Sequence, residues 1–527
     1  MATVHELTGA SLIGSGESRE GPEFHAIDPA TGTRLEPAYH DAGPVDVDRA
    51  AALAWQAFER YRHTSHAERA AFLETIAAEI DALGDTLIDR VTAETGIPAA
   101  RVKGELARTT GQLRLFADVV RDGDWAQARL DTPDPDRAPL PKPDLRQRSI
   151  PVGPVAGFAA SNFPLAFSVA GGDTASALAA GAPVIVKAHP GHPGTSELVG
   201  RAITKAVAAH GLPEGTFSLL ISSGIEVGVS LVADPRIRAV GFTGSRRAGL
   251  ALTAAAAARP VPIPVYAEMS SINPVFVFPG ALADRAEQLG RDFIASALTG
   301  VGQLCTSPGM VFVADGPDTD VFISSASAGL AEAPAGPLLN AGIAAAFHDG
   351  ARRAAETPGV QQVATGGSDG RACTGQAQLL VTTAHDYLHH AGLADEVFGP
   401  SSVIVRARPD QLTDIVETLE GQLTATVHAA AADHPHVADL IPHLELIAGR
   451  IVFNGWPTGV EVGHATVHGG PFPATSAPST TSVGSRAIER FLRPVAYQNF
   501  PEDLVPSEIR RDNPLGIPQR IDGRLPA

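Results

Sequence analysis

The sequence predicts an α/β protein with two lobes, each built on a parallel β-sheet, after an N-terminal helical segment. Apolar residues recur at three- and four-residue spacing from about residue 46 to residue 122, which is typical of amphipathic helices. Short apolar runs then alternate with helical segments up to residue 266, and a second alternating series begins at residue 272. Strands that alternate with helices of this length favour parallel sheets with crossover helices.

The expected elements follow in order along the chain. Residues 1–45 are rich in glycine, proline and polar residues, and we expect mainly loops there. The proline-rich segment 131–147 is predicted to be a linker. The predicted strands of the first lobe are VAGFA, PVIVK, FSLLIS, IRAVGF and PVYAEM. Those of the second lobe are INPVFVF, GMVFVA, QLLVTT, SVIVRA, LTATVHA and GRIVFNG.

Composition and charge disfavour several functional classes. Hydrophobic residues make up 44% of the 527 residues and charged residues 19%, so the chain can build large cores. The formal net charge of −18 disfavours binding to nucleic acid or to an anionic membrane surface. The uncharged stretch between Arg148 and Asp173 contains prolines and polar residues, which favours a buried strand, turn and helix over a membrane span. Two cysteines, and an N-terminus without a leader pattern, predict a cytoplasmic protein.

A candidate phosphate-binding turn lies at residues 242–249. The chain contains no Gly-x-Gly-x-x-Gly fingerprint, so a nucleotide would need another loop. This turn follows a predicted strand and opens an alanine-rich helix. Gly244 permits a tight turn, and Ser245 with free backbone N–H groups can hold a phosphate. An ordinary strand-to-helix turn capped by Ser245 explains the same residues equally well.

Three residues have side chains suited to nucleophilic, acid–base or hydrogen-bond chemistry. Cys305 lies in a turn after a predicted helix, where it is either a nucleophile or a small buried residue. Glu268 ends an apolar run, either as a functional carboxylate or as a charged residue that merely emerges at a strand end. Asn162 stands in a strand-to-helix turn, either as a hydrogen-bond donor or as an ordinary turn asparagine. Cys373 lies in a polar stretch without a catalytic pattern.

The order of six motifs resembles the aldehyde dehydrogenase superfamily, from about residue 20 to residue 515. The motifs are Asn162-Phe163-Pro164, Lys187 at the end of a buried strand, Phe242-Thr243-Gly244-Ser245, Glu268, Gly302-Gln303-Leu304-Cys305-Thr306 and Glu396-Val397-Phe398-Gly399-Pro400. The chain resembles the branch that contains the α-ketoglutarate semialdehyde dehydrogenases and an NADP-dependent fatty aldehyde dehydrogenase. It departs from the broader family at residues 468–473, where HGGPFP replaces the usual Gly-Gly-x-Lys-x-Ser-Gly segment.

The resemblance implies oxidation of an aldehyde to a carboxylate with NAD(P)⁺ as the oxidant. Cys305 would attack the aldehyde to form a thiohemiacetal, while the Asn162 amide and the Cys305 backbone N–H hold the oxyanion. Glu268 would act as the general base that hydrolyses the resulting thioester. His468 is expected either near Cys305, where it affects the thiolate or the proton path, or in a loop without a catalytic role.

The resemblance also implies a cofactor site without a metal. Its predicted contacts are Lys187 for the adenosine ribose, Gly244 and Ser245 for the pyrophosphate, and Glu396, with Phe398 in the same motif, for the nicotinamide ribose. NAD-preferring members often have a glutamate three residues after the lysine, where this chain has Pro190. Since that repulsive carboxylate is missing, NADP is predicted as the cofactor, with NAD also possible.

The predicted substrate is 2,5-dioxopentanoate, which would be oxidised to 2-oxoglutarate. Arg108 and Gln112, four residues apart on a predicted helix, would be available for its carboxylate. The alternative is an aliphatic or fatty aldehyde, with Phe163, Phe167 and Trp456 lining an apolar tunnel. A CoA-acylating dehydrogenase and a cofactor-free esterase are less favoured, because the predicted base suits hydrolysis and no Cys–His spacing is recognisable.

Three spatial domains are expected from the resemblance. Residues 1–134 and 153–266 would form the NAD(P)-binding domain, and residues 267–485 the catalytic domain. Residues 135–152 and 486–527 would form a small oligomerisation sheet. Because exposed strands of this kind need a partner, a homodimer or homotetramer is predicted.

Overall fold

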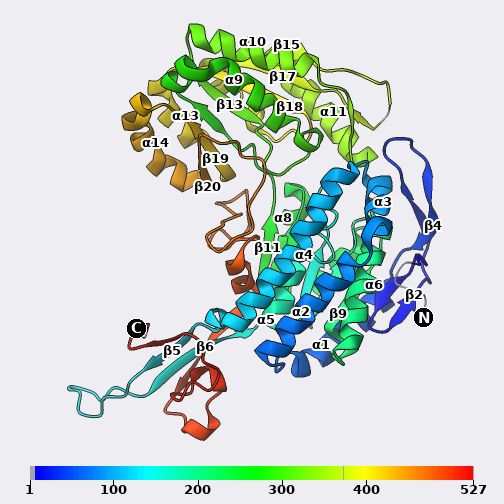
Figure 1. Cartoon of the computed structure of the whole chain (residues 1–527), viewed down its shortest axis with the longest axis vertical. Coiled ribbons are helices and arrows are strands. Elements are labelled where there is room, and N and C mark those ends of the chain that lie inside the picture. Colours follow the sequence, from blue (N-terminus) through cyan, green and yellow to red (C-terminus); the bar gives the residue numbers. More distant parts are fainter. Residues whose placement is uncertain (1–5, 372, 526–527) are drawn as a thin grey trace.

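The computed structural model describes residues 6–371 and 373–525. Figure 1 shows two lobes, one above the other, and a narrow arm that projects from the lower lobe. Each lobe holds a seven-stranded sheet, so the predicted α/β class with two sheet-based lobes is confirmed.

The predicted helical segment forms a layer on the lower lobe (Figure 1). Its helices are α1 (Pro44–Tyr61), α2 (His66–Asp81), α3 (Gly84–Thr95) and α4 (Ala99–Asp122). Ser65 caps α2 by accepting a hydrogen bond from the backbone N–H of Glu68, whose carboxylate returns the contact. Gly123 ends α4 with a φ of 80°, a left-handed conformation that glycine adopts without strain. α4 therefore spans the lower lobe from the upper lobe to the arm.

The sheet of the lower lobe has the strand order β11-β10-β7-β8-β9-β1-β2. Its parallel strands are β7 (Val155–Phe158), β8 (Val184–Lys187), β9 (Phe217–Leu220), β10 (Ala239–Thr243) and β11 (Val265–Glu268). The helices between them are α5 (Gly172–Ala180), α6 (Pro193–Ala209), α7 (Glu226–Ala233) and α8 (Arg246–Ala257). The strand order reverses at β7, since β8 lies on one side of it and β10 on the other. Open α/β sheets bind ligands at the carboxyl ends of strands beside such a reversal.

The prediction of loops for residues 1–45 was wrong in part. This region contains β1 (Ser11–Ile13), β2 (Gly16–Ser18), β3 (Glu23–Ile27) and β4 (Arg34–His40). β1 extends the lower sheet by pairing antiparallel with β9, and β3 pairs with β4. These strands are too short to give a clear alternating pattern, and pairing with the edge of an existing sheet stabilises them instead.

The sheet of the upper lobe has the order β15-β17-β18-β13-β12-β19-β20, and all pairs except β15–β17 are parallel. Its strands are β12 (Val275–Val277), β13 (Met310–Ala314), β15 (Gln361–Thr365), β17 (Gln378–Thr383), β18 (Ser401–Ala407), β19 (Gln422–His428) and β20 (Ala448–Phe453). The six predicted strands are all present, and the unpredicted β15 joins at the edge. A small additional pair consists of β14 (Gly336–Pro337) and β16 (Thr374–Gly375).

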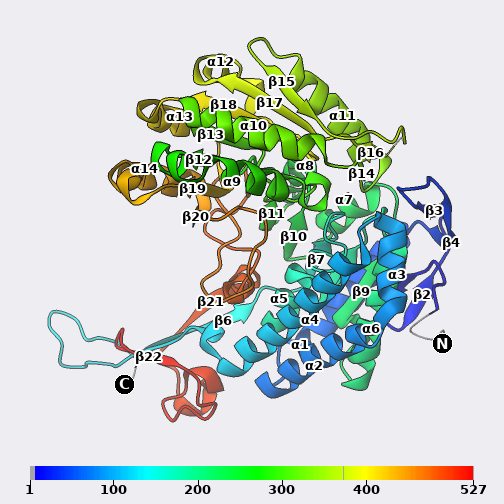
Figure 2. The ribbon, with the colours of Figure 1, turned by 45° about the horizontal axis from the view of Figure 1, so that its top comes forward.

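Helices cover both faces of the upper sheet (Figure 2). One face packs against α9 (Pro279–Ala297) and α10 (Pro317–Ala331), and the other packs against α12 (Ala384–His389), α13 (Leu412–Thr418) and α14 (His434–Ile447). α11 (Ala341–Ala355) lies beside β14 and β16 at the junction with the lower lobe. Because apolar side chains cover both faces, the strands read as continuous apolar runs.

The arm is a four-stranded sheet with the order β21-β6-β5-β22. It combines β5 (Ala128–Asp131) and β6 (Leu145–Pro151) with β21 (Leu492–Gln498) and β22 (Gln519–Ile521). The predicted linker at 131–147 is instead the loop and flanking strand residues of a hairpin, because β5 and β6 pair antiparallel. β5 also lies outside the segment 135–152 that was expected to supply the sheet.

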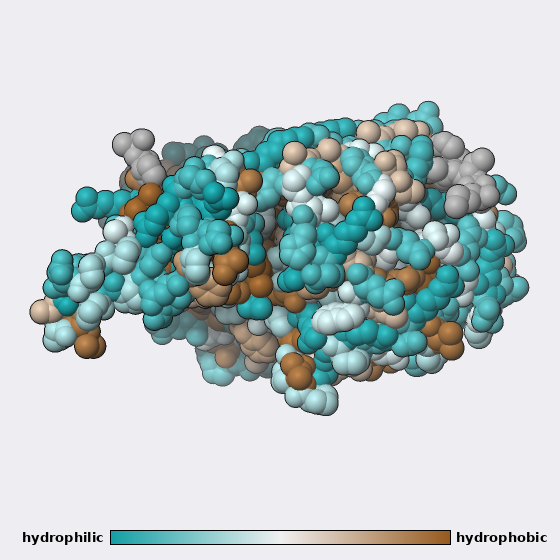
Figure 3. Space-filling view, turned by 90° about the horizontal axis from the view of Figure 1, so that it is seen from below, coloured by the Kyte–Doolittle hydropathy of each residue, from teal (hydrophilic) through white to brown (hydrophobic). Residues whose placement is uncertain are grey.

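The surface of the protein is mainly hydrophilic on the face seen in Figure 3. Hydrophobic side chains form small groups between the hydrophilic ones. Among the described helices, none has the length and hydrophobicity that a membrane span requires.

Candidate active site

The lower sheet brings four predicted site segments to one edge. Lys187 ends β8 and Glu268 ends β11, and their neighbours in the ladder are Phe158 of β7 and Thr243 of β10. Asn162 follows β7 and the turn with Gly244 follows β10. Residues that are far apart in the chain therefore meet at the carboxyl ends of adjacent strands.

Cys305 reaches this edge from the upper lobe. It follows α9 and a short 3₁₀ segment (Thr299–Gly302), in which Gly302 has a φ of 67°. A Cβ atom at Gly302 would lie 2.4 Å from the carbonyl oxygen of Gly399, so only glycine lets the cysteine loop approach the segment of Glu396. The Asn273 amide donates to the carbonyl oxygens of Cys305 at 2.8 Å and Ser307 at 2.9 Å. Asn273 therefore holds the loop of Cys305 in place. The sequence analysis did not assign this role to Asn273.

Asn162 faces the same loop. Its side-chain Nδ2 donates to the carbonyl oxygen of Gln303 at 3.0 Å, and its backbone carbonyl accepts from Arg101 at 2.9 Å. The side chain is buried. Because an amide nitrogen carries two hydrogens, one N–H group of Asn162 remains for a ligand beside Cys305.

His468 lies between Cys305 and Glu268. Its Nε2 atom is 3.6 Å from Cys305 Sγ and 2.9 Å from Glu268 Oε1. The other carboxylate oxygen of Glu268 accepts a hydrogen bond from Ser482 Oγ at 2.8 Å. Of the two expectations for His468, this geometry favours a place beside Cys305, because its ring contacts both predicted catalytic side chains.

The histidine stands in a segment without helices or long strands, residues 454–482, which packs back onto the lower lobe. The backbone of Met269 donates to Ala474, and that of Ser476 donates to Ala267, so this segment runs beside β11. His468 itself is held by Thr481, which accepts from its backbone N–H at 2.9 Å. Sequence reasoning assigned no role to Ser482.

The protonation states of the three groups follow from burial and from each other. Burial alone raises the pKa of Glu268, but His468, Ser482 and Cys305 outweigh it and hold that pKa below its ordinary value. Burial also raises the pKa of the Cys305 thiol, and the negative charges of Glu268 and Glu396 add to the rise. The carboxylate is therefore ionised beside a protonated thiol, which makes it the proton acceptor. His468 then donates through Nε2–H, because an ionised carboxylate only accepts.

The predicted adenosine and phosphate contacts lie along the same edge. Lys187 Nζ donates to the Ser222 carbonyl at 2.8 Å, and burial lowers its pKa to about 8. Ser245 Oγ accepts from the backbone N–H of Ala248 at 3.3 Å, so Ser245 is the N-cap of α8. The hydroxyl hydrogen remains free to donate, so capping and phosphate binding are compatible. Pro190 lies in the half-buried turn after β8, so position 190 itself carries no carboxylate.

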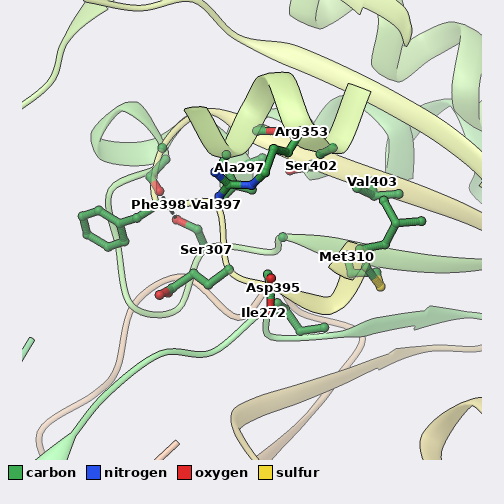
Figure 4. A pocket seen from close by; sticks show the side chains of 18 of the residues that line it. Ile272, Ala297, Ser307, Met310, Arg353, Asp395, Val397, Phe398, Ser402 and Val403 are labelled. Carbon is green, nitrogen blue, oxygen red and sulfur yellow. Dashed lines mark hydrogen bonds between the residues drawn. The ribbon is translucent and has the colours of Figure 1, made fainter. Parts of the chain in front are cut away.

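Glu396 and Phe398 border a cavity of about 400 Å³ between the cysteine loop and α11 (Figure 4). Ser307 of the cysteine loop and Arg353 of α11 also line it. Burial raises the pKa of Glu396 to about 7, and the charge of Glu268 contributes to the rise. The backbone N–H of Ser271 donates to its carboxylate at 3.4 Å. Glu396 is thus placed to meet a polar ligand near Cys305.

Two further expectations concern side chains near the site. The ligand atoms of Glu268, Cys305 and His468 lie within 4.8 Å of one another, close enough to hold a metal ion as well as to exchange protons. The predicted absence of a metal therefore stays a prediction.

The expectation that Trp456 lines a substrate tunnel was wrong, since its ring packs on Phe293 at 5.7 Å and His428 at 4.6 Å inside the upper lobe.

Comparison with known proteins agrees with this geometry. An α-ketoglutaric semialdehyde dehydrogenase 2 from Azospirillum brasilense is 54% identical over 523 residues, covering 98% of this chain and 99% of that protein. An α-ketoglutaric semialdehyde dehydrogenase from Acinetobacter baylyi is 47% identical and covers 91% of each chain.

Solved structures share the fold. A 1-pyrroline-5-carboxylate dehydrogenase has a TM-score of 0.79 at 20% identity, covering 93% of this chain and 92% of its own. A 3,6-anhydro-L-galactose dehydrogenase has the same TM-score at 21% identity, covering 93% and 99%. A model of the aldehyde dehydrogenase family matches residues 16–471. The chain therefore belongs to the aldehyde dehydrogenase family, whose members oxidise small aldehydes with NAD(P)⁺.

Proposed function

We propose that this enzyme oxidises 2,5-dioxopentanoate to 2-oxoglutarate, with NADP⁺ as the preferred cofactor. The reaction type is supported by the contacts of His468 with Cys305 and with Glu268. The substrate is supported by the two relatives named as α-ketoglutaric semialdehyde dehydrogenases, which match nearly the whole chain.

The first step is activation of the thiol. Glu268 accepts the proton of Cys305, because its carboxylate is ionised while the buried thiol is protonated. His468 and Ser482 each donate to one oxygen of Glu268 and keep it oriented. The thiolate then attacks the aldehyde carbon, and a carbon–sulfur bond forms as the carbonyl π electrons move to oxygen.

The second step is stabilisation of the oxyanion. The free N–H of Asn162, whose side chain binds the cysteine loop, and the backbone N–H of Cys305 would be the donors. Preorganised donors of this kind lower the barrier because they need no reorganisation during the reaction. When bound, the NAD(P)⁺ nicotinamide supplies a hydride acceptor, and the cysteine then carries a thioester.

The last step is hydrolysis of the thioester. Glu268, after it has released the thiol proton to solvent, takes a proton from a water molecule that attacks the carbonyl carbon. The carbon–sulfur bond breaks, and the products are the carboxylate and the free cysteine.

The residues at the strand ends suit a dinucleotide. Lys187 is a half-buried cation with a backbone carbonyl as its hydrogen-bond partner, and the first turn of α8 offers free N–H groups beside Gly244 and Ser245. Glu396 would bind the nicotinamide ribose, with Phe398 beside it. The preference for NADP⁺ is supported by Pro190, because position 190 carries no carboxylate that would repel a 2′-phosphate.

We also propose that the arm is an oligomerisation sheet, with the domain division given above, and that the enzyme is a cytoplasmic homodimer or homotetramer. β21 is an edge strand on the projecting arm, and unpaired strand edges favour pairing with a second chain. Light scattering on the purified enzyme would give the mass, and a monomer would contradict this proposal.

Initial rates of NAD(P)H formation test the substrate and cofactor. We expect kcat/KM for 2,5-dioxopentanoate to exceed that for octanal by about tenfold or more, and NADP⁺ to exceed NAD⁺. Octanal as the better substrate would instead identify an aliphatic aldehyde dehydrogenase. Product formation only with added CoA would indicate an acylating enzyme.

A further inference from the structure

Three side chains of different chemistry meet at the catalytic centre. A carboxylate oxygen of Glu268, the sulfur of Cys305 and a ring nitrogen of His468 all lie within 4.8 Å of one another. Carboxylate, thiolate and imidazole are the groups with which proteins bind Zn²⁺. Zinc sites with three protein ligands leave a fourth position open for water or another small ligand. The cluster therefore has the ligand set of a zinc site with three protein ligands.

The distances within the cluster fit tetrahedral coordination. Zinc bonds of about 2.3 Å to sulfur and about 2.1 Å to nitrogen and oxygen place the ligand atoms roughly 3.4–3.6 Å apart. Cys305 Sγ and His468 Nε2 are 3.6 Å apart, so they already have this separation. Glu268 Oε1 is 2.9 Å from the same nitrogen, so the carboxylate has to move away by about 0.5 Å to admit the ion.

The charges around the sulfur suit a divalent cation. A carboxylate at Glu268 and a thiolate at Cys305 together neutralise a doubly charged ion, which a largely buried site requires. The ion displaces the thiol proton when it binds, and solvent takes that proton. Glu268 and Glu396 act on the thiol more strongly than the Arg108 guanidinium does. The local charge therefore favours a cation.

The cluster is accessible from one side. Glu268 and His468 are buried, whereas Cys305 is half-buried. An ion would therefore reach the cluster past the sulfur, and the open coordination position would face the same side.

The surroundings of His468 limit how tightly an ion is held. A zinc-bound histidine almost always donates its other ring N–H to a carboxylate, a carbonyl or water. His468 Nδ1 is buried and has no hydrogen-bond partner among the described residues. When Nε2 binds the metal, the ring proton has to stand on this unpaired nitrogen. Loss of such a partner costs about ten- to a hundredfold in metal affinity, so we expect an exchangeable ion.

We propose that Cys305, His468 and Glu268 bind Zn²⁺ and that the ion is a reversible inhibitor of the enzyme. The ion occupies the sulfur that attacks the aldehyde and the carboxylate that accepts a proton. Neither ligand changes its oxidation state, so removal of the ion by a chelator restores activity. This inference lies beyond the proposed function, whose steps use no metal.

Direct metal binding is the first test, and it does not depend on activity. Full-length enzyme freed of metal is titrated with Co²⁺, whose bond to a thiolate gives a charge-transfer band in the near ultraviolet. We expect this band in the wild type, with saturation at one ion per chain, and displacement of Co²⁺ by Zn²⁺. Cys305→Ala should abolish the band, while His468→Ala and Glu268→Gln should each weaken binding about tenfold or more. Thermal melting of each variant reports whether the fold is intact.

Two control variants distinguish the cluster from other possible sites. Cys373→Ala removes the second thiol of the chain and should keep the band. The second control carries His385→Ala and His389→Ala together. These two histidines are exposed on α12, and their ring centroids lie 4.3 Å apart, so they could bind zinc at the surface. Their replacement should change neither the band nor the inhibition.

Inhibition of aldehyde oxidation tests the consequence. Micromolar free Zn²⁺ should inhibit the wild type, and EDTA should restore its rate. His468→Ala retains the nucleophile and the base, and on the plateau of its pH profile it should need about tenfold more Zn²⁺ or more for half-inhibition. Equal sensitivity of the wild type and His468→Ala would overturn the inference. So would absence of the band from the wild type, or a rate that Zn²⁺ leaves unchanged while the band forms.

Discussion

The edge of the lower sheet and the 454–482 segment contribute to one site by different physical means. Lys187 and Glu268 stand at the ends of β8 and β11, two parallel strands of one sheet, and the backbone ladder sets their positions. His468 stands in irregular chain and is held by side-chain hydrogen bonds with Thr481 and Ser482. It lies 163 residues from Cys305 and 200 residues from Glu268 along the sequence.

We expect the two regions to serve different functions, cofactor binding in one and the chemical steps in the other. Lys187 and the turn after β10 offer a rigid surface on which a large cofactor can lie, so changes there should affect cofactor binding. The irregular segment approaches the reacting sulfur and tunes the charge of Glu268, so changes there should affect the chemical steps and their pH dependence. Four substitutions test this division.

Replacement of the nucleophile has the largest expected effect. Cys305→Ala should lower kcat on the order of ten-thousandfold or more, because no other described thiol lies near Glu268. Cys373→Ala is the matched control and should retain full activity. Undiminished turnover in Cys305→Ala would exclude the proposed mechanism.

Glu268→Gln should lower steady-state kcat by roughly a hundred- to ten-thousandfold, since the amide cannot accept a proton from the thiol or from water. Rapid-quench measurement of NAD(P)H formation in the first turnover shows which of the two steps is slowed more. If the variant turned over like the wild type, Glu268 would be only a structural partner of His468.

Lys187→Met should raise KM for NADP⁺ about tenfold while kcat changes little, because this residue lies at the cofactor edge and not beside Cys305. Lys205→Met removes an exposed lysine that pairs with Glu79 and serves as the control. A loss confined to kcat would break the proposed division between the two regions.

His468→Ala should change the pH dependence more than the maximal rate. His468 is the first of the neighbours that lower the pKa of Glu268, and without it burial dominates and that pKa rises. Because Glu268 must be ionised to act as a base, activity is lost at higher pH during acidification. The acidic limb of the kcat profile should move up by about one pH unit or more.

The matched variants for this prediction are His468→Gln and His464→Ala. Glutamine retains an N–H donor for Glu268 and should restore part of the wild-type profile. His464 is an exposed histidine of the same segment, and its replacement should have no effect. An unshifted acidic limb in His468→Ala would show that Ser482 alone keeps Glu268 ionised.

The sequence predicted the parallel strands of both lobes because buried parallel strands are continuous apolar runs, such as those that became β8 and β18. Asn162, Lys187, Gly244 and Glu268 lie at or just after such runs, and the resemblance to the family joined them into one predicted site. The sequence did not predict the short strands at the sheet edges. β1 and β15 lie at sheet edges and depend on pairing with a neighbour.

The sequence alone determined the family, the α/β class, the nucleophile candidate and the strand-end residues, because these depend on local pattern and on the order of motifs. Only the tertiary structure decided that His468 and Ser482 meet Glu268, and that Asn273 holds the loop of Cys305. These contacts join segments that are distant in the chain and lack a periodic pattern. Their positions follow from how the upper lobe and the 454–482 segment pack on the lower sheet, which no local pattern encodes.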